Sequence, residues 1–283
     1  MICFIKVYGR SNLHMCLREA QKLMVTILKD IDKICSENNI NYWIESGTLL
    51  GAIRHKGFIP WDDDIDIGML RQDYEKFINI CDKRLPEDLF INNYKKNKDM
   101  ICQWSKVVHK NSEFIEENGV TGLFVDIFPY DFYDEEGKIL KKKMKLAKRY
   151  EININSNKNF SKPFIKSLKK NSKILFCKFL SFFVKDKDFS KFYNSCNEIS
   201  RSSNIKNNKV IGYGVEVSRY NNFFNLYDIF PLKKIKFENI EVFAPNNVNN
   251  CLKEYYGENY MEIPKKELRV YHNKGIKIIC NRE

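Results

Sequence analysis

The sequence contains no apolar run long enough to cross a membrane. Its longest strongly apolar segment, residues 174–184, spans 11 residues and includes Lys178, whereas a membrane-spanning helix needs about 20 apolar residues. The amino terminus also lacks the pattern of a signal peptide, because the apolar residues 2–5 are too few and Lys6 follows them at once. We therefore expect a cytoplasmic protein, for which peripheral contact with the inner face of the membrane stays open.

Paired cysteines are absent as well. The nine cysteines are scattered along the chain, and no two of them have the CxxC spacing. Cys35, Cys81 and Cys102 lie in apolar surroundings, which is typical of small buried side chains. A disulfide framework is not expected at this length and spacing, so the sequence favours a reducing compartment.

Acidic residues are outnumbered by basic ones. The chain has 48 Lys and Arg against 36 Asp and Glu, a net charge of +12. The excess is concentrated in residues 138–186, which contain fifteen Lys or Arg and two acids. Such a segment indicates either an anionic partner or a solvated helical face. At 283 residues the chain could form one large domain or two modest ones. We predict a single domain over residues 1–283, with a basic helical insertion at residues 138–205.

The most informative segment is residues 47–68, which leads from a glycine turn through a basic cluster to four aspartates. These are Asp62, Asp63, Asp64 and Asp66. Carboxylates this close repel one another, but together they suit a divalent metal ion beside a phosphate group. Asp64 and Asp66 alternate with isoleucines, which predicts a strand over residues 65–69 with both carboxylates on one face. Asp62 would join them if the strand reached back, whereas Asp63 would point outward or support the other ligands.

Two other interpretations of the aspartates are weaker. A calcium-binding loop would need glycine and glutamate where this chain has Ile67 and Asp73. A solvated acidic turn would not be flanked by Ile59, Ile65 and Ile67, which indicate a buried strand.

A later apolar segment, residues 123–128, contains Asp126 as its one charge. A carboxylate inside an apolar strand is costly unless a positive group holds it. We therefore predict that Asp126 binds metal or acts as a catalytic base; a buried carboxylate satisfied by hydrogen bonds is the alternative.

The apolar periodicity also predicts the remaining elements. Helices are expected at residues 13–38, 49–54, 73–85 and 248–256, and strands at residues 41–45, 90–93, 102–109, 210–217 and 235–243. The helix at residues 49–54 follows Gly47 and Thr48, so its amino terminus is a natural phosphate site. Arg54, with its planar guanidinium, and then Lys56 are candidates to bind that phosphate. Lys106 is a weaker candidate.

Residues 47–68 resemble the signature of the LicD family, the choline-phosphate transferases of bacterial surface glycans, with fukutin-type enzymes as more distant relatives. Further blocks resemble the family in the same order. They are residues 28–35, 39–43, 124–131 and 256–264, the last followed by Arg269 and His272. Residues 137–205 resemble the family only in character.

The family in turn resembles nucleotidyltransferases of the DNA polymerase beta type, which implies an α+β fold with a mixed sheet flanked by helices. The resemblance makes Asp64, Asp66 and Asp126 the catalytic and metal-binding residues. The implied metal is Mg²⁺, as one or two ions, with Mn²⁺ able to substitute. The implied donor- and phosphate-binding residues are Gly47, Thr48, Arg54, Lys56, Lys106, Arg269 and His272.

The resemblance implies transfer of phosphocholine, or a related phospho-alcohol, from a CDP-linked donor to a hydroxyl of a cell-surface glycan. Lipopolysaccharide, teichoic acid and capsule are the expected acceptors, as free glycan or glycolipid, and nucleic acid is not an expected partner. Three other activities stay open. They are glycerol-, ribitol- or sugar-phosphate transfer on the same fold, nucleotidyl transfer to nucleic acid or a small molecule, and non-catalytic binding to a membrane surface.

Overall fold

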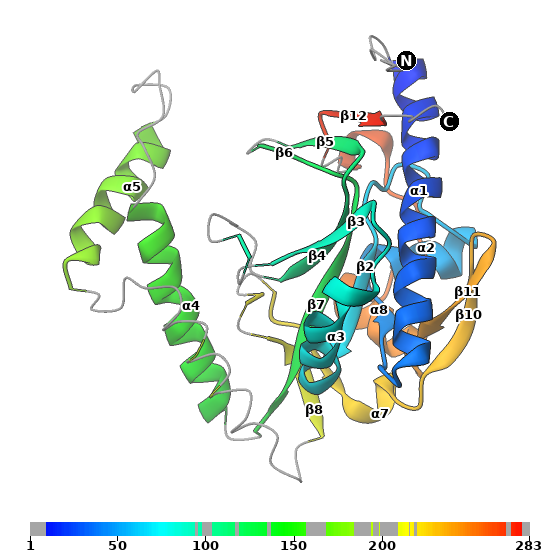
Figure 1. The fold of residues 1–283 in the computed structure, drawn as a ribbon. Coiled ribbons are helices and arrows are strands. Elements are labelled where there is room, and N and C mark those ends of the chain that lie inside the picture. The colour runs from blue at the N-terminus through cyan, green and yellow to red at the C-terminus, as the bar shows by residue number, and fades with distance from the viewer. Residues whose placement is uncertain are drawn as a thin grey trace.

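The structure is a computed structural model, and a mixed seven-stranded sheet lies at its centre (Figure 1). It describes residues 10–93, 96–97, 104–116, 119–134, 137–156, 168–183, 194, 198, 209–214, 216–217, 220–269 and 273–278. The sheet has the order β1-β2-β7-β4-β3, with β8 paired to β7 and β9 to β8. These strands are β1 (Trp43–Ile44), β2 (Asp66–Leu70), β3 (Leu89–Asn92), β4 (Ser105–His109), β7 (Phe124–Tyr133), β8 (Val210–Tyr213) and β9 (Phe223–Asn225). Only the β2–β7 pair is parallel in this sheet, so the α+β expectation for the described chain is confirmed.

Helices and two smaller sheets surround the central sheet. The helices are α1 (Arg10–Glu37), α2 (Ser46–His55), α3 (Arg71–Arg84), α4 (Lys138–Ser156), α5 (Leu168–Ser181), α7 (Leu226–Ile229), α8 (Val248–Tyr256) and the 3-10 turn η1 (Lys266–Leu268). One small sheet is the hairpin of β10 (Lys233–Phe237) and β11 (Ile240–Ala244), and the other joins β12 (Gly275–Ile278), β5 (Ser112–Glu116) and β6 (Gly119–Thr121). In Figure 1, α4 and α5 stand to one side of the sheet and α1 stands on the other.

The core confirms the apolar periodicity of α1. The residues at spacings of three and four are at most 5% exposed: Leu17, Ala20, Met24, Ile27, Leu28, Ile31 and Ile34. They pack with the strand β7, whose apolar residues are buried on both faces as expected for a central strand. Cys35 and Cys81 are buried in the same core, as predicted, whereas Cys102 lies outside the described residues.

Several expected boundaries were wrong. The expected strand at residues 235–243 is a hairpin that turns at Glu238, whose φ is +54°. The strand at residues 123–128 extends to Tyr133, and the helix expected at residues 49–54 begins three residues earlier at Ser46. The short strands β5, β6, β9 and β12 were not expected at all, because three to five residues carry little periodicity. Within the described residues, no helix combines the length and apolarity needed to cross a bilayer.

A buried ion-pair cluster joins α3 to the strands that follow it in the sheet. Arg71 donates two hydrogen bonds to Asp131 on β7, both at 2.9 Å, and two to Glu216, at 2.6 and 2.8 Å. All three side chains are at most 6% exposed. The guanidinium therefore holds Glu216, just beyond β8, against the central sheet.

Candidate active site

Three charged side chains lie in one row across adjacent strands of the central sheet. Asp66 of β2 stands opposite Asp126 of β7, and Lys106 of β4 stands opposite Asp126 on its other side. Directly opposed residues point to the same face of a sheet, so the three share one face. Lys106 Nζ lies 3.0 Å from Asp126 Oδ1, and the side chains are only 10% and 7% exposed. This ion pair is the positive contact that the buried Asp126 was expected to need. Because Lys106 already provides it, a metal-binding role for Asp126 stays a prediction.

The loop before β2 gathers the other aspartates. One carboxylate oxygen from each of Asp62, Asp63 and Asp64 lies within 4.8 Å of the others. Gly47 permits this arrangement, because a Cβ at residue 47 would lie 2.9 Å from Asp62 Oδ2. Since β2 begins only at Asp66, Asp64 lies in the loop rather than on the predicted strand. The loop, and not strand alternation, brings the first three aspartates together.

Asp63 was predicted either to point outward or to support the other ligands, and it does not point outward, because the residue is only 1% exposed. Its Oδ2 accepts hydrogen bonds from the backbone N–H of Asn273 at 2.8 Å and from the side-chain amide of Asn273 at 2.5 Å. On the other side of the loop, Gln21 of α1 donates to the carbonyl of Asp62 at 2.9 Å. Asp63 therefore supports the loop, and segments from both ends of the described chain hold it in place.

The first turn of α2 lies against this acidic loop. Gly47 and Thr48 were expected to form a turn before the helix, but α2 begins at Ser46 and includes them. The Thr48 hydroxyl is buried and accepts the backbone N–H of Asp66 at 2.9 Å. Thr48 therefore fixes the first residue of β2. Binding of a phosphate group at the amino terminus of the helix stays a prediction.

The electrostatics of the site reflect its crowded carboxylates. Burial raises the pKa of Asp66 well above its usual value, and the neighbouring carboxylates, Asp64 and Asp126 first, raise it further. Burial also raises the pKa of Tyr256, at the end of α8, and the charges of Asp66 and Asp62 add to the shift. The crowded negative charges disfavour ionisation of these carboxyl groups, and a bound divalent cation would relieve that repulsion. The set of carboxylate oxygens therefore fits Mg²⁺.

A buried glutamate beside the site was not among the sequence candidates. Glu45 is fully buried, and burial raises its pKa to about 8. The Tyr213 hydroxyl donates to Glu45 Oε1 at 2.8 Å, and it also lies 3.3 Å from the Ser46 hydroxyl. The backbone N–H of Glu45 donates to the carbonyl of Asp66 at 3.1 Å. In the sequence, Glu45 could have been noticed because it stands just before Ser46 and Gly47. Nothing in the residues around Tyr213 indicates its role.

Arg54, the first candidate for phosphate binding, makes contacts with the carboxyl-terminal block. Its NH1 donates to the carbonyls of Tyr260 and Glu262, both at 3.0 Å, and its Nε donates to the imidazole of His55 at 3.0 Å. Burial lowers the pKa of Arg54. The residue therefore joins α2 to residues 260–262, and a contact with donor phosphate stays a prediction.

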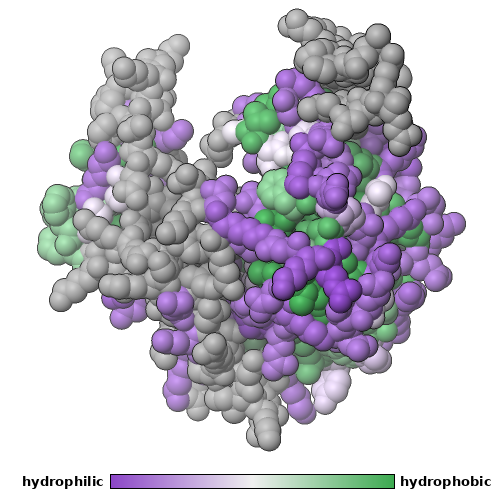
Figure 2. Space-filling model, in the orientation of Figure 1, coloured by the Kyte–Doolittle hydropathy of each residue, from purple (hydrophilic) through white to green (hydrophobic). Residues whose placement is uncertain are grey.

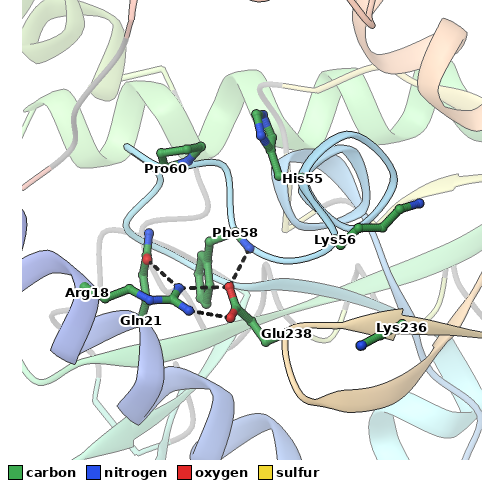
Figure 3. Close-up of a pocket in the computed structure, with 8 residues that line it drawn as sticks. All are labelled: Arg18, Gln21, His55, Lys56, Phe58, Pro60, Lys236 and Glu238. Carbon is green, nitrogen blue, oxygen red and sulfur yellow. Dashed lines mark hydrogen bonds and ion pairs between the residues drawn. The ribbon is translucent and has the colours of Figure 1, made fainter.

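Lys56 lines a separate cavity of about 540 Å³. Figure 3 shows this cavity between α1, the end of α2 and the β10–β11 hairpin. Its floor is an ion pair in which Arg18 contacts Glu238 at 2.6 Å, while Glu238 Oε1 also accepts the backbone N–H of Phe58 at 3.0 Å. Lys56 caps α2 in the left-handed conformation, with φ of +63°. No contact in the described residues brings Lys56 to the aspartates, so its predicted phosphate role gains no support.

Arg269 does reach the neighbourhood of the aspartates. Its guanidinium carbon lies 3.9 Å from the ring centroid of Trp61, the residue before Asp62, and its Nε donates to the carbonyl of Pro264 at 3.3 Å. This contact brings the carboxyl-terminal block to the acidic loop, and donor binding by Arg269 stays a prediction. His272 lies outside the described residues.

Comparison with known proteins identifies related chains. The family model described as "LicD/FKTN/FKRP, nucleotidyltransferase domain" matches residues 39–173. The lipopolysaccharide cholinephosphotransferase LicD of Haemophilus influenzae is 30% identical over 269 residues, which cover 91% of this chain and 96% of that protein. An uncharacterised protein of Rickettsia prowazekii is 44% identical over 91 residues, 25% of this chain and 34% of its own length. Human ribitol 5-phosphate transferase FKRP is 28% identical over 125 residues, 44% of this chain and 22% of its own length.

These relatives and the acidic site together support a phosphotransferase as the class of protein. The chain belongs to the LicD family, since the match to the Haemophilus influenzae protein extends over nearly the whole of both chains.

Proposed function

We propose that this chain transfers phosphocholine from a CDP-linked donor to a hydroxyl group of a cell-surface glycan, with Mg²⁺ as its cofactor. The observation that carries the proposal is the row of Lys106, Asp126 and Asp66 on three adjacent strands, next to the loop of Asp62–Asp64. An ammonium group and several carboxylates on one face suit a phosphate ester and a divalent cation. The relative in Haemophilus influenzae is named for cholinephosphate transfer to lipopolysaccharide.

The residues have distinct roles in this proposal. Asp64, Asp66 and Asp126 would hold Mg²⁺, which when bound neutralises charge on the transferring phosphoryl group. The amino terminus of α2 at Gly47 directs N–H groups toward phosphate oxygens. Lys106 adds positive charge beside them, with its Nζ 3.0 Å from Asp126 Oδ1.

The reaction is a single displacement at phosphorus. The acceptor oxygen forms a bond to the choline-bearing phosphorus, the bond to the bridging oxygen breaks, and CMP leaves with that electron pair. Asp126 orients the acceptor hydroxyl and accepts its proton. Mn²⁺ substitutes for Mg²⁺ in this proposal, because both ions prefer carboxylate and phosphate oxygens.

Aromatic side chains near the carboxylates favour a cationic headgroup. Tyr256 lies close enough to the aspartates for their charges to raise its pKa, and it is 46% exposed. Tyr220, 50% exposed, has its ring centroid 5.7 Å from that of Tyr213, with the rings tilted at 45°, and Tyr213 contacts Glu45. Tyrosine faces attract quaternary ammonium groups, as choline binding requires. These rings support phosphocholine over an uncharged alcohol.

Ribitol-phosphate transfer is the second candidate, because human FKRP, a ribitol 5-phosphate transferase, is among the relatives. CMP release from CDP-choline, CDP-ribitol and CDP-glycerol, each with Mg²⁺ and a lipopolysaccharide or teichoic acid acceptor, separates the headgroups. We expect CDP-choline to give the highest kcat/KM. Turnover of CDP-ribitol alone would refute the choline assignment, and nucleotide incorporation into RNA without CMP release would refute the proposal.

The carboxylates are tested in the same assay. We expect Asp126→Asn to slow CMP release at least about a thousandfold, equivalent to about 4 kcal/mol of barrier. Asp82→Asn is the matched control, because Asp82 is 51% exposed and pairs with Lys96 on the surface. A folded Asp126→Asn protein with near-normal turnover would exclude the proposed role.

A further inference from the structure

An exposed apolar face lies on α5 and on the turn that follows it, at the end of the molecule that stands apart from the central sheet. Its residues, called here the α5 face, are Leu175, Phe176, Phe179, Phe182 and Phe183, and they are 60% to 83% exposed. Figure 2 shows hydrophobic side chains at the left edge of the molecule, where Figure 1 places α5. Large apolar residues that are exposed together mark an interaction surface.

The position of these residues on the helix separates them from the packing contacts of α5. Leu175, Phe176 and Phe179 lie on one side of α5 at helical spacing, and Phe182 and Phe183 follow in the turn after Ser181. The opposite side packs against α4 through Asn171, Ile174 and Cys177, which are at most 5% exposed. The apolar residues of this segment therefore fall into two groups. Ile174 packs between the two helices, whereas the α5 face is exposed and covers no other element of the described chain.

Positive charge surrounds the α5 face. The α4 helix carries seven Lys or Arg and one Glu, and α5 carries four Lys and no acid, which makes +10 of the net +12 of the chain. Helical spacing places Lys173 along one edge of the α5 face and Lys178 along the other. Lys173 is 61% exposed and pairs with Glu151 of α4 at 2.7 Å. Lysines with long apolar stems beside an aromatic face suit an interface between hydrocarbon and anionic headgroups.

We infer that the α5 face docks into the surface of a bilayer that contains anionic phospholipid. A second copy of this chain is a poorer occupant, because two α5 helices in contact would bring their lysines and those of α4 together. An anionic lipid surface offers the opposite charge and an apolar layer at once.

Docking at α5 has a consequence for the active site. The base of α4 is attached to the catalytic sheet, since Ile139 packs with Tyr133 of β7 and Lys143 donates to the carbonyl of Tyr213. Tyr213 in turn contacts Glu45 beside the aspartates. A bilayer bound at α5 would therefore lie at a set distance from the site, as a lipid-linked acceptor requires.

Co-sedimentation of the full chain with vesicles tests the inference. We expect binding to vesicles of about 30% phosphatidylglycerol in phosphatidylcholine and at least about tenfold weaker binding to phosphatidylcholine alone. The double variant Phe179→Ser, Phe183→Ser should bind the anionic vesicles about a hundredfold more weakly, about tenfold for each ring withdrawn from lipid. Its matched control is Val120→Ser with Tyr227→Ser, which removes side chains that are 62% and 64% exposed elsewhere on the surface.

The lysines have a parallel test. Lys173→Gln with Lys178→Gln should weaken anionic vesicle binding about 20-fold and reduce its salt dependence, whereas Lys29→Gln with Lys83→Gln should not. CMP release with a water-soluble acceptor should be the same in all four double variants, which separates this inference from the proposed function. Equal binding by the α5 and control variants, or concentration-dependent dimers that Phe179→Ser dissolves without any vesicle binding, would overturn the inference.

Discussion

Replacing Asp66 with asparagine should make the metal-free protein more stable and the enzyme far less active. Asp66 is the residue whose pKa is raised by burial and by every neighbouring carboxylate. Asparagine keeps the shape of the side chain and removes its charge. A residue retained for folding would behave in the opposite way, because its loss would lower stability and activity together.

The sign of the pH dependence follows from the raised pKa. Below the ordinary value of 3.8, Asp66 is protonated in both the folded and unfolded states and contributes no penalty. As pH rises from 3.8 toward the raised pKa, the folded metal-free protein loses stability by about 1.4 kcal/mol for each pKa unit of the shift. Asp66→Asn removes this loss, so its advantage is absent at pH 3.5 and present at pH 8.

Mg²⁺ should reverse the order of the two proteins. A cation at 100 times its Kd stabilises the folded state by about 2.7 kcal/mol, which raises Tm by about 5 to 10 °C for a chain of this size. The wild-type protein should show this rise, whereas Asp66→Asn should show little of it because one carboxylate ligand is lost. CMP release by Asp66→Asn should fall at least about a thousandfold.

Thermal unfolding at pH 3.5 and pH 8, with EDTA or with Mg²⁺, provides the measurement, alongside CMP release. Asp82→Asn is again the matched control, and its Tm should respond to Mg²⁺ as the wild type does. If metal-free Asp66→Asn is less stable than wild type at pH 8, the electrostatic account of the site is wrong. If its Tm rises with Mg²⁺ as in the wild type, Asp66 is not a ligand.

Three further predictions concern the framework of the site. Arg71→Met should lower the free energy of unfolding by about 3–5 kcal/mol, because it leaves two buried carboxylates unpaired. Arg84→Met removes a surface ion pair of 4.0 Å and should cost less than about 1 kcal/mol. Urea unfolding compares the two variants, and equal losses would contradict the burial argument. Glu238→Gln should lower the free energy of unfolding by about 1–2 kcal/mol at pH 7. Since the Arg18 hydrogen bond lowers the pKa of Glu238 from 4.5, the loss measured by urea unfolding should shrink as pH falls below 4.5. A loss that stays constant with pH would argue against the ion pair. Thr48→Val should cost about 1–3 kcal/mol by leaving the N–H of Asp66 without its acceptor and should slow CMP release, and normal turnover would show that the start of β2 tolerates the change.

The sequence predicted the elements whose signals are local. The period of two around Ile65 and Ile67 located β2, the periodicity of residues 13–38 located α1, and the single charge in an apolar strand singled out Asp126. Each of these depends on contacts that a regular element makes along its own length. The start of α2 was not predicted: the helix begins at Ser46 and includes Gly47, and its Thr48 hydroxyl accepts a hydrogen bond from the start of β2, a contact outside the helix itself.

The parts of the site that the sequence did not predict depend on distant contacts. Asp63 is turned inward by Asn273, 210 residues away, and Glu45 meets Tyr213, 168 residues away. No periodicity links such pairs, because the chain between them closes loops whose geometry is set by the whole sheet. Arg54 illustrates the same limit: its charge and position suggested a phosphate ligand, yet carbonyls near the carboxyl terminus occupy its NH1.

The family resemblance and the α5 face belong to different parts of the molecule. The blocks around residues 47–68, 124–131 and 256–264 meet at one site, where β2, β7 and the end of α8 converge. The match to the family model ends at residue 173, inside α5 and before Leu175, the first residue of the α5 face. The family model therefore covers the strands that carry Asp66 and Asp126 but not the surface that we infer to meet the bilayer. Membrane binding has to be measured on this chain, and a variant that loses it while keeping full turnover would show that the two properties are separable.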